Sequence, residues 1–98
     1  MRITKEQIQL IAETVSQLAG TDAAVYLFGS RLNDQIKGGD IDLFIESDAE
    51  LTLIDRARIK MKLESRLGLP VDIVSKTRGA MATPFQAIAQ SRSYRLQA

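Results

Sequence analysis

Two carboxylates stand close together where an apolar run begins near the middle of the chain. The run starts with Asp40, Ile41 and Asp42 and continues to Ile45. Positions i and i+2 of a strand face the same side, so the two carboxylates would lie about 6 to 7 Å apart. Like charges on a buried strand repel each other and lose hydration unless a cation, a proton or a basic side chain offsets them. Lys37 is the only base nearby and the chain has no histidine, so a divalent metal is the simplest offset, and oxygen ligands favour Mg²⁺ or Mn²⁺.

The segment before this pair has the composition of a phosphate-binding turn. The apolar stretch from Ala23 to Phe28 ends at Gly29, which is followed by Ser30 and Arg31. Glycine lets a backbone amide come close to a ligand, and a helical turn that follows Ser30 would point its N–H groups toward an anion. The Ser30 hydroxyl and the Arg31 guanidinium are further donors that suit phosphate. Beside a carboxylate pair, this turn suggests a nucleoside triphosphate bridged by metal.

A third carboxylate, Asp72, interrupts the apolar run Val71–Val74. It would join the other two if its strand lies beside the strand that carries Asp40 and Asp42. Each feature alone also has an ordinary explanation: a simple turn at Gly-Ser, a solvated strand edge or helix cap at Asp-x-Asp, and a strand-end cap at Asp72. Their joint placement at predicted strand ends is what favours a functional site.

The segments around these motifs predict the elements that must position them. Thr4 and Gln7 form a capping box for a helix that stops at Gly20, and Thr83 with Pro84 starts a last short helix. Strands are predicted at 23–28, 41–45 and 71–75, and a long helix from about 49 to 67. This order predicts an α/β protein of the α+β type, with a small three-stranded mixed sheet packed with helices.

The long predicted helix is apolar on two sides. One stripe consists of Leu53, Ile54, Ala57 and Met61, and the other of Ile59, Leu63 and Leu67. We expect the first stripe to cover the sheet. The second would then be free for a neighbouring helix, a second copy of the chain or another protein, and basic neighbours would favour an acidic partner surface.

Composition narrows the classes of function. A chain of 98 residues is expected to form one domain, residues 1–98. The absence of cysteine and histidine excludes disulfides, Ser-His-Asp and Cys-His catalysis and the usual zinc ligands. The net charge of +1 is too small to suggest a nucleic-acid or membrane partner, and the basic residues between 56 and 66 suit a solvated helix face. No apolar run approaches the ~20 residues of a membrane span, so we expect a cytoplasmic protein.

The joint pattern resembles the minimal nucleotidyltransferases of the DNA polymerase beta superfamily, the MNT-type antitoxins often paired with an HEPN-family ribonuclease toxin. The resemblance covers nearly the whole chain and rests on Leu27–Arg31, Asp40–Leu43 and Val71–Val74. It implies the polymerase beta-like nucleotidyltransferase fold. In that family the Gly-Ser turn, here Gly29 and Ser30, holds the triphosphate. The Asp-x-Asp pair holds two Mg²⁺ ions, and the acid on the third strand completes the site and helps deprotonate the acceptor hydroxyl.

The resemblance also implies an activity and a partner. The activity is Mg²⁺-dependent transfer of AMP from ATP, or of another nucleotide from its triphosphate, to a hydroxyl of a partner protein. The partner would be an HEPN-type toxin, with this chain as its antitoxin. The chain could also associate with further copies of itself. The alternative is a non-catalytic nucleotide- or partner-binding module that neutralises its partner by occlusion. Nucleotide transfer to the partner, compared with binding alone, separates the two.

Overall fold

The computed structural model describes residues 3–29 and 40–97. The elements are α1 (Lys5–Ala19), β1 (Ala24–Phe28), β2 (Ile41–Ser47), α2 (Leu53–Leu67), β3 (Val71–Thr77), α3 (Pro84–Ser91) and β4 (Tyr94–Leu96). The α+β class and the mixed sheet are confirmed. The helix starts at Thr4 and Thr83 are also confirmed, because each threonine accepts a hydrogen bond from the backbone N–H three residues on.

The sheet has four strands in the order β3-β2-β1-β4, so the prediction of three strands was wrong. β2 pairs in parallel with β3 and antiparallel with β1, and β4 adds to the other edge of β1. β4 has only three residues, too few for a periodic signal in the sequence. Its extended conformation is instead stabilised by long-range pairing with β1.

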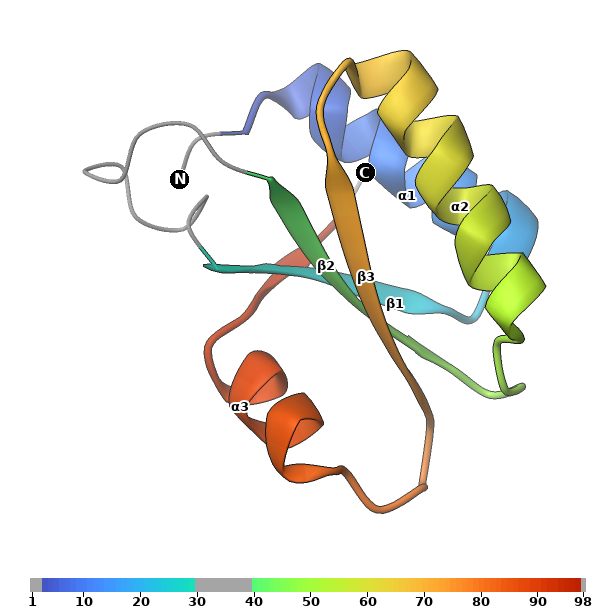
Figure 1. Ribbon diagram of the computed structural model, residues 1–98, viewed down its shortest axis with the longest axis vertical. Coiled ribbons are helices and arrows are strands. Elements are labelled where there is room, and N and C mark those ends of the chain that lie inside the picture. The colour runs from blue at the N-terminus through green and yellow to red at the C-terminus, as the bar shows by residue number, and fades with distance from the viewer. Residues whose placement is uncertain (1–2, 30–39, 98) are drawn as a thin grey trace.

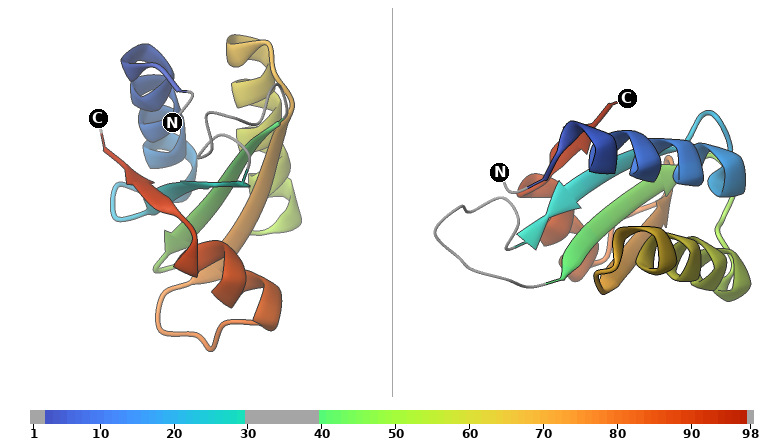
Figure 2. Two further views of the ribbon diagram at one scale, coloured as in Figure 1. Left: turned by 90° about the vertical axis from the view of Figure 1, so that its left-hand side faces the viewer. Right: turned by 90° about the horizontal axis from the view of Figure 1, so that it is seen from above.

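The helices lie on both faces of the sheet. Figures 1 and 2 show α1 and α2 side by side over one face, with α3 at the opposite face. The main core lies under α1 and α2 and contains Ile11, Val15, Ile41, Leu43, Ile45, Ile59, Leu63 and Val71. On the α3 face Phe44 is fully buried and makes an edge contact with Tyr26, with ring centroids 6.0 Å apart. Alternate residues of β2 therefore serve opposite faces.

The apolar stripes of α2 have the opposite roles to those expected. Ile59 and Leu63 are fully buried against the sheet, whereas Leu53, Ile54 and Met61 are 74%, 65% and 69% exposed. The expectation that the Leu53 stripe covers the sheet was therefore wrong. Tertiary contacts decide which side of α2 faces the sheet, and Leu51, just before the helix, also joins the core. The helix begins at Leu53 rather than near residue 49 because Thr52 caps it locally through the backbone N–H of Asp55.

Within the described residues, every helix is too short or too polar to cross a membrane.

Candidate active site

The parallel pairing of β2 and β3 brings two of the three candidate acids together. Asp42 and Asp72 are direct register partners. Their neighbours Ile41, Leu43 and Val71 are buried in the core, so strand alternation puts Asp42 and Asp72 on the opposite face of the sheet, with Asp72 on the edge strand β3 within reach of α2. Asp42 is partly buried and the Asp72 side chain is 59% exposed, which leaves this end of the sheet open to solvent. Asp40 lies just before β2 and is exposed.

Gly29 ends β1 directly against this acid pair. The last residue of β1, Phe28, pairs with Asp42, and Gly29 follows with φ of +81°. A Cβ atom at Gly29 would overlap the Asp42 carboxylate. The positive φ favours glycine here, and any larger residue would have to displace the Asp42 side chain. The other two residues assigned to the phosphate-binding turn, Ser30 and Arg31, lie outside the described residues.

Replacing Gly29 by alanine tests this close approach. Gly29→Ala is expected to destabilise the fold by about 1–2 kcal/mol from the positive φ alone, and to displace the Asp42 carboxylate. The matched control is Gly79→Ala, which has a similar φ of +85° but nothing within 4 Å of an added Cβ. Gly29→Ala should have a lower melting temperature and weaker metal-dependent nucleotide binding than Gly79→Ala. Equal nucleotide binding by both would show that the contact with Asp42 has no role in the site.

The electrostatics of the site centre on Asp42. Burial, and then repulsion by Asp72 and Asp40, raises the pKa of the Asp42 carboxyl above its ordinary value. Ionisation of Asp42 therefore costs free energy in the folded chain, and a cation at the site would reduce that cost. A hard divalent cation fits this all-oxygen set of donors.

Lys60 is a neighbour of the site that the sequence analysis missed. Its Nζ lies 3.7 Å from Asp72 Oδ1 and 3.2 Å from Glu64 Oε2, and it donates a hydrogen bond to the Val71 carbonyl. Lys60 is twelve residues before Asp72 and is brought there by α2 packing beside the edge strand β3. No local pattern in the sequence signals that contact, which is why only Lys37 was considered as a nearby base.

The acids alone do not form a complete metal cage. Among the residues that the structure describes, no group of three or more acidic side chains is arranged to hold a metal ion. Mg²⁺ is commonly bound by one or two carboxylates, with substrate phosphates and water as its other ligands. Asp42 with Asp40 or Asp72 fits that mode, in which nucleotide and metal bind together.

The raised pKa of Asp42 has a measurable effect on stability. The folded chain keeps the Asp42 proton to higher pH than the unfolded chain, so its stabilising contribution is present at low pH and is lost as pH rises through the raised pKa. Asp42→Asn should therefore raise the melting temperature in EDTA at pH 7. That gain should shrink as pH falls toward the ordinary value of 3.8. Melts of both proteins in the same buffers check this, and a variant less stable at pH 7 would contradict it.

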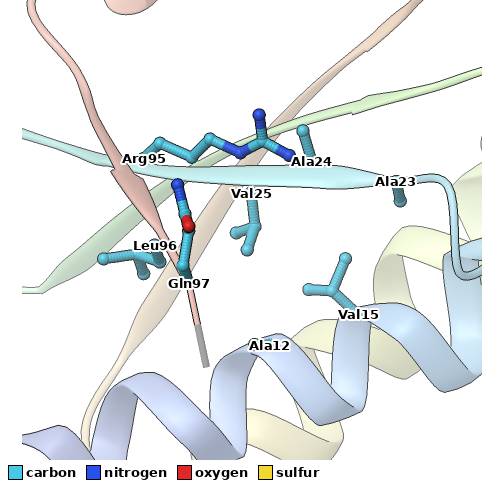
Figure 3. Close-up of a pocket in the computed structure, with 8 residues that line it drawn as sticks. All are labelled: Ala12, Val15, Ala23, Ala24, Val25, Arg95, Leu96 and Gln97. Carbon is cyan, nitrogen blue, oxygen red and sulfur yellow. The ribbon is translucent and has the colours of Figure 1, made fainter.

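A separate hollow of about 260 Å³ lies between α1 and the β1–β4 edge. Figure 3 shows Val15 of α1 and Val25 of β1 pointing toward one another there, with Arg95 and Gln97 at the β4 side. Among the described residues that line it, none carries a carboxylate.

Comparison with known proteins identifies the fold family. Residues 8–95 match the family described as nucleotidyltransferase domain. A solved structure described as a minimal nucleotidyltransferase is 31% identical, with a TM-score of 0.63, and the match covers 95% of this chain and 96% of that one.

Two further structures are toxin–antitoxin complexes. One is a tri-AMPylated HEPN toxin in complex with an MNT antitoxin from Shewanella oneidensis. The matched chain of that complex is 25% identical to this chain, with a TM-score of 0.63, and the match covers 92% of this chain and 71% of that chain. The other is described as a toxin-antitoxin with AMP-PNP and is 22% identical to this chain. Its TM-score is 0.73, and the match covers 97% of this chain and 73% of that chain, which shows that the two share a fold. No curated protein matches this chain.

Proposed function

Because this chain belongs to the nucleotidyltransferase domain family, we propose that it transfers AMP from ATP to a hydroxyl of a partner protein in a reaction that requires Mg²⁺ or Mn²⁺. The observation that supports this most is the register pair of Asp42 and Asp72, with Gly29 packed against the Asp42 carboxylate. At this open end of the sheet, carboxylates that suit a metal ion lie next to a glycine whose backbone is close enough to contact a bound ligand.

In this proposal the residues have separate tasks. Asp40, Asp42 and Asp72 hold the metal ions, while Gly29, Ser30 and Arg31 bind the triphosphate. Bound metal would stabilise charge on the phosphates. The acceptor oxygen forms a bond to the α-phosphorus, the bond from that phosphorus to the bridging oxygen breaks, and pyrophosphate leaves. Asp72 receives the proton of the acceptor hydroxyl, and Lys60 holds its carboxylate in place from the side of α2.

We propose an HEPN-family ribonuclease toxin as the partner, with this chain as its antitoxin. The support is the likeness to an MNT antitoxin found with an AMPylated HEPN toxin. A supply of ATP and an intracellular target would place the reaction in the cytoplasm. The domain that carries it would span residues 1–98.

Neutralisation by occlusion alone remains the second candidate. One observation favours it: Lys60 already places a positive charge 3.7 Å from Asp72, so part of the acid cluster is offset without metal. In that case the chain would inhibit its partner only while bound to it.

The persistence of inhibition distinguishes the two functions. Tagged chain, the partner ribonuclease, ATP and Mg²⁺ are incubated together, the chain is removed on its tag, and ribonuclease activity is then measured. Covalent modification predicts that the partner stays inactive, and that EDTA during the incubation prevents this. Full recovery of ribonuclease activity in both samples would support occlusion and contradict the proposed transfer.

A further inference from the structure

The outward side of α2 presents apolar side chains to solvent. We call this surface the α2 ridge; it consists of Leu53, Ile54, Ala57 and Met61, all of them exposed. A helix with apolar residues on both its core and its outer side normally has a second packing partner. In the described part of the chain, the core packing of α2 involves Ile59 and Leu63 instead.

The α2 ridge leads into a hollow that reaches the candidate site. This α2–β3 hollow has a volume of about 370 Å³ and is lined by Leu53, Arg56, Ala57, Lys60, Asp72 and Ile73. Figure 1 shows why it forms there: α2 runs alongside β3, which is the outer strand of the sheet on this side. Asp72 is thus shared between the carboxylate pair and the hollow. A side chain held in this hollow would lie beside the acid to which we assign proton removal.

The charges around the hollow define the chemistry of its occupant. α2 carries five basic residues and two acidic ones. Lys60 is already paired with Glu64 and Asp72. Arg56 lines the hollow, and its Nε is buried without a hydrogen-bond partner among the described residues. Buried polar atoms are ordinarily hydrogen-bonded, and a carboxylate is a strong acceptor for an arginine side chain.

We propose that the α2 ridge and the α2–β3 hollow are the docking site of the acceptor protein, and that they bind an apolar side chain flanked by a carboxylate. The apolar side chain packs on the ridge and enters the hollow, while the carboxylate pairs with Arg56. Docking there brings the acceptor hydroxyl to the Asp72 side of the site. This inference rests on the proposed function, because it concerns the partner of the same transfer reaction.

Charge substitutions on the ridge test the docking site against matched controls. Met61→Glu and Ile54→Glu are compared with Met81→Glu and Ile88→Glu, whose parent side chains are 94% and 59% exposed near α3. The probe is the ribonuclease toxin proposed as the partner, and the readouts are its binding by calorimetry, AMP transfer to it, and Mg²⁺–ATP binding by each variant. The ridge variants should bind the probe about tenfold more weakly or worse, a loss typical of central interface residues. AMP transfer by the ridge variants should reach the wild-type rate only at correspondingly higher probe concentrations. Their affinity for Mg²⁺–ATP should stay unchanged.

The outcomes separate this inference from the proposed function. If the ridge variants bind the probe as tightly as wild type, or if the α3 controls lose as much affinity, the docking site is wrong and the proposed function stands. If the wild-type chain binds Mg²⁺–ATP but neither binds nor modifies the probe, the proposed partner is wrong and the docking site falls with it.

Discussion

The double variant Asp40→Asn, Asp42→Asn is expected to lose AMP transfer by on the order of 10³-fold or more while remaining folded. Asparagine keeps the size of each side chain and removes the charge that a divalent cation needs. Because burial and neighbouring acids raise the pKa of Asp42, loss of its charge should not weaken the fold. Single-turnover transfer and thermal melts in EDTA give the two readouts.

The matched control is Asp48→Asn with Glu50→Gln, which removes two exposed acids at the same i, i+2 spacing in the same acidic segment. This control should transfer AMP at nearly the wild-type rate. Full activity of the Asp40, Asp42 double variant would place the metal site elsewhere. A melting temperature well below that of wild type would make the acid pair a structural element.

The second large effect is expected in the core: Leu63→Glu should unfold the chain. Leu63 is fully buried between α2 and the sheet, and a buried carboxylate without a partner costs about 4–5 kcal/mol or more. That cost is comparable with the whole stability of a small domain, about 5–15 kcal/mol.

Met61→Glu is the matched control for this prediction. It lies two residues away on the same helix, and its parent side chain is 69% exposed. Circular dichroism melts should show a fold close to wild type for Met61→Glu and little cooperative unfolding for Leu63→Glu. A folded Leu63→Glu variant that only lost association with a partner would reinstate the Leu63 stripe as an interface.

Local signals in the sequence were sufficient for most element boundaries. Thr4 with Gln7 and Thr83 with Pro84 fix helix starts through bonds to residues three positions away. The expected helix end at residue 67 agrees with the structure, in which Gly68 ends α2 in a left-handed conformation. These features depend on neighbours in the chain, so they could be predicted without tertiary structure.

Features that depend on tertiary contacts could not be predicted in the same way. The two stripes of α2 had comparable apolar content, and only the packing of Ile59 and Leu63 into the core distinguishes them. β4 exists because Tyr94–Leu96 pairs with β1, some seventy positions earlier in the sequence.

The sequence was sufficient to predict which acids form the candidate site, but only part of their arrangement in space. The types and spacing of Asp40, Asp42 and Asp72 indicated adjacent carboxylates, and the register of β2 with β3 places the last two side by side. The contact of Gly29 with Asp42 and the approach of Lys60 to Asp72 arise from the meeting of separate elements. Sequence spacing therefore indicated the candidate acids but not the residues that contact them.

Labelled ATP provides the most direct test of nucleotide transfer by this chain. The chain is incubated with Mg²⁺, the ribonuclease toxin proposed as its partner, and ATP that carries its label on either the α- or the γ-phosphate. We expect label from α-labelled ATP on the partner, none from γ-labelled ATP, and no transfer in EDTA. Label from the γ-phosphate would show a kinase reaction, and the absence of label from both, with an intact complex and Mg²⁺ present, would contradict the assignment as a nucleotidyltransferase of that partner.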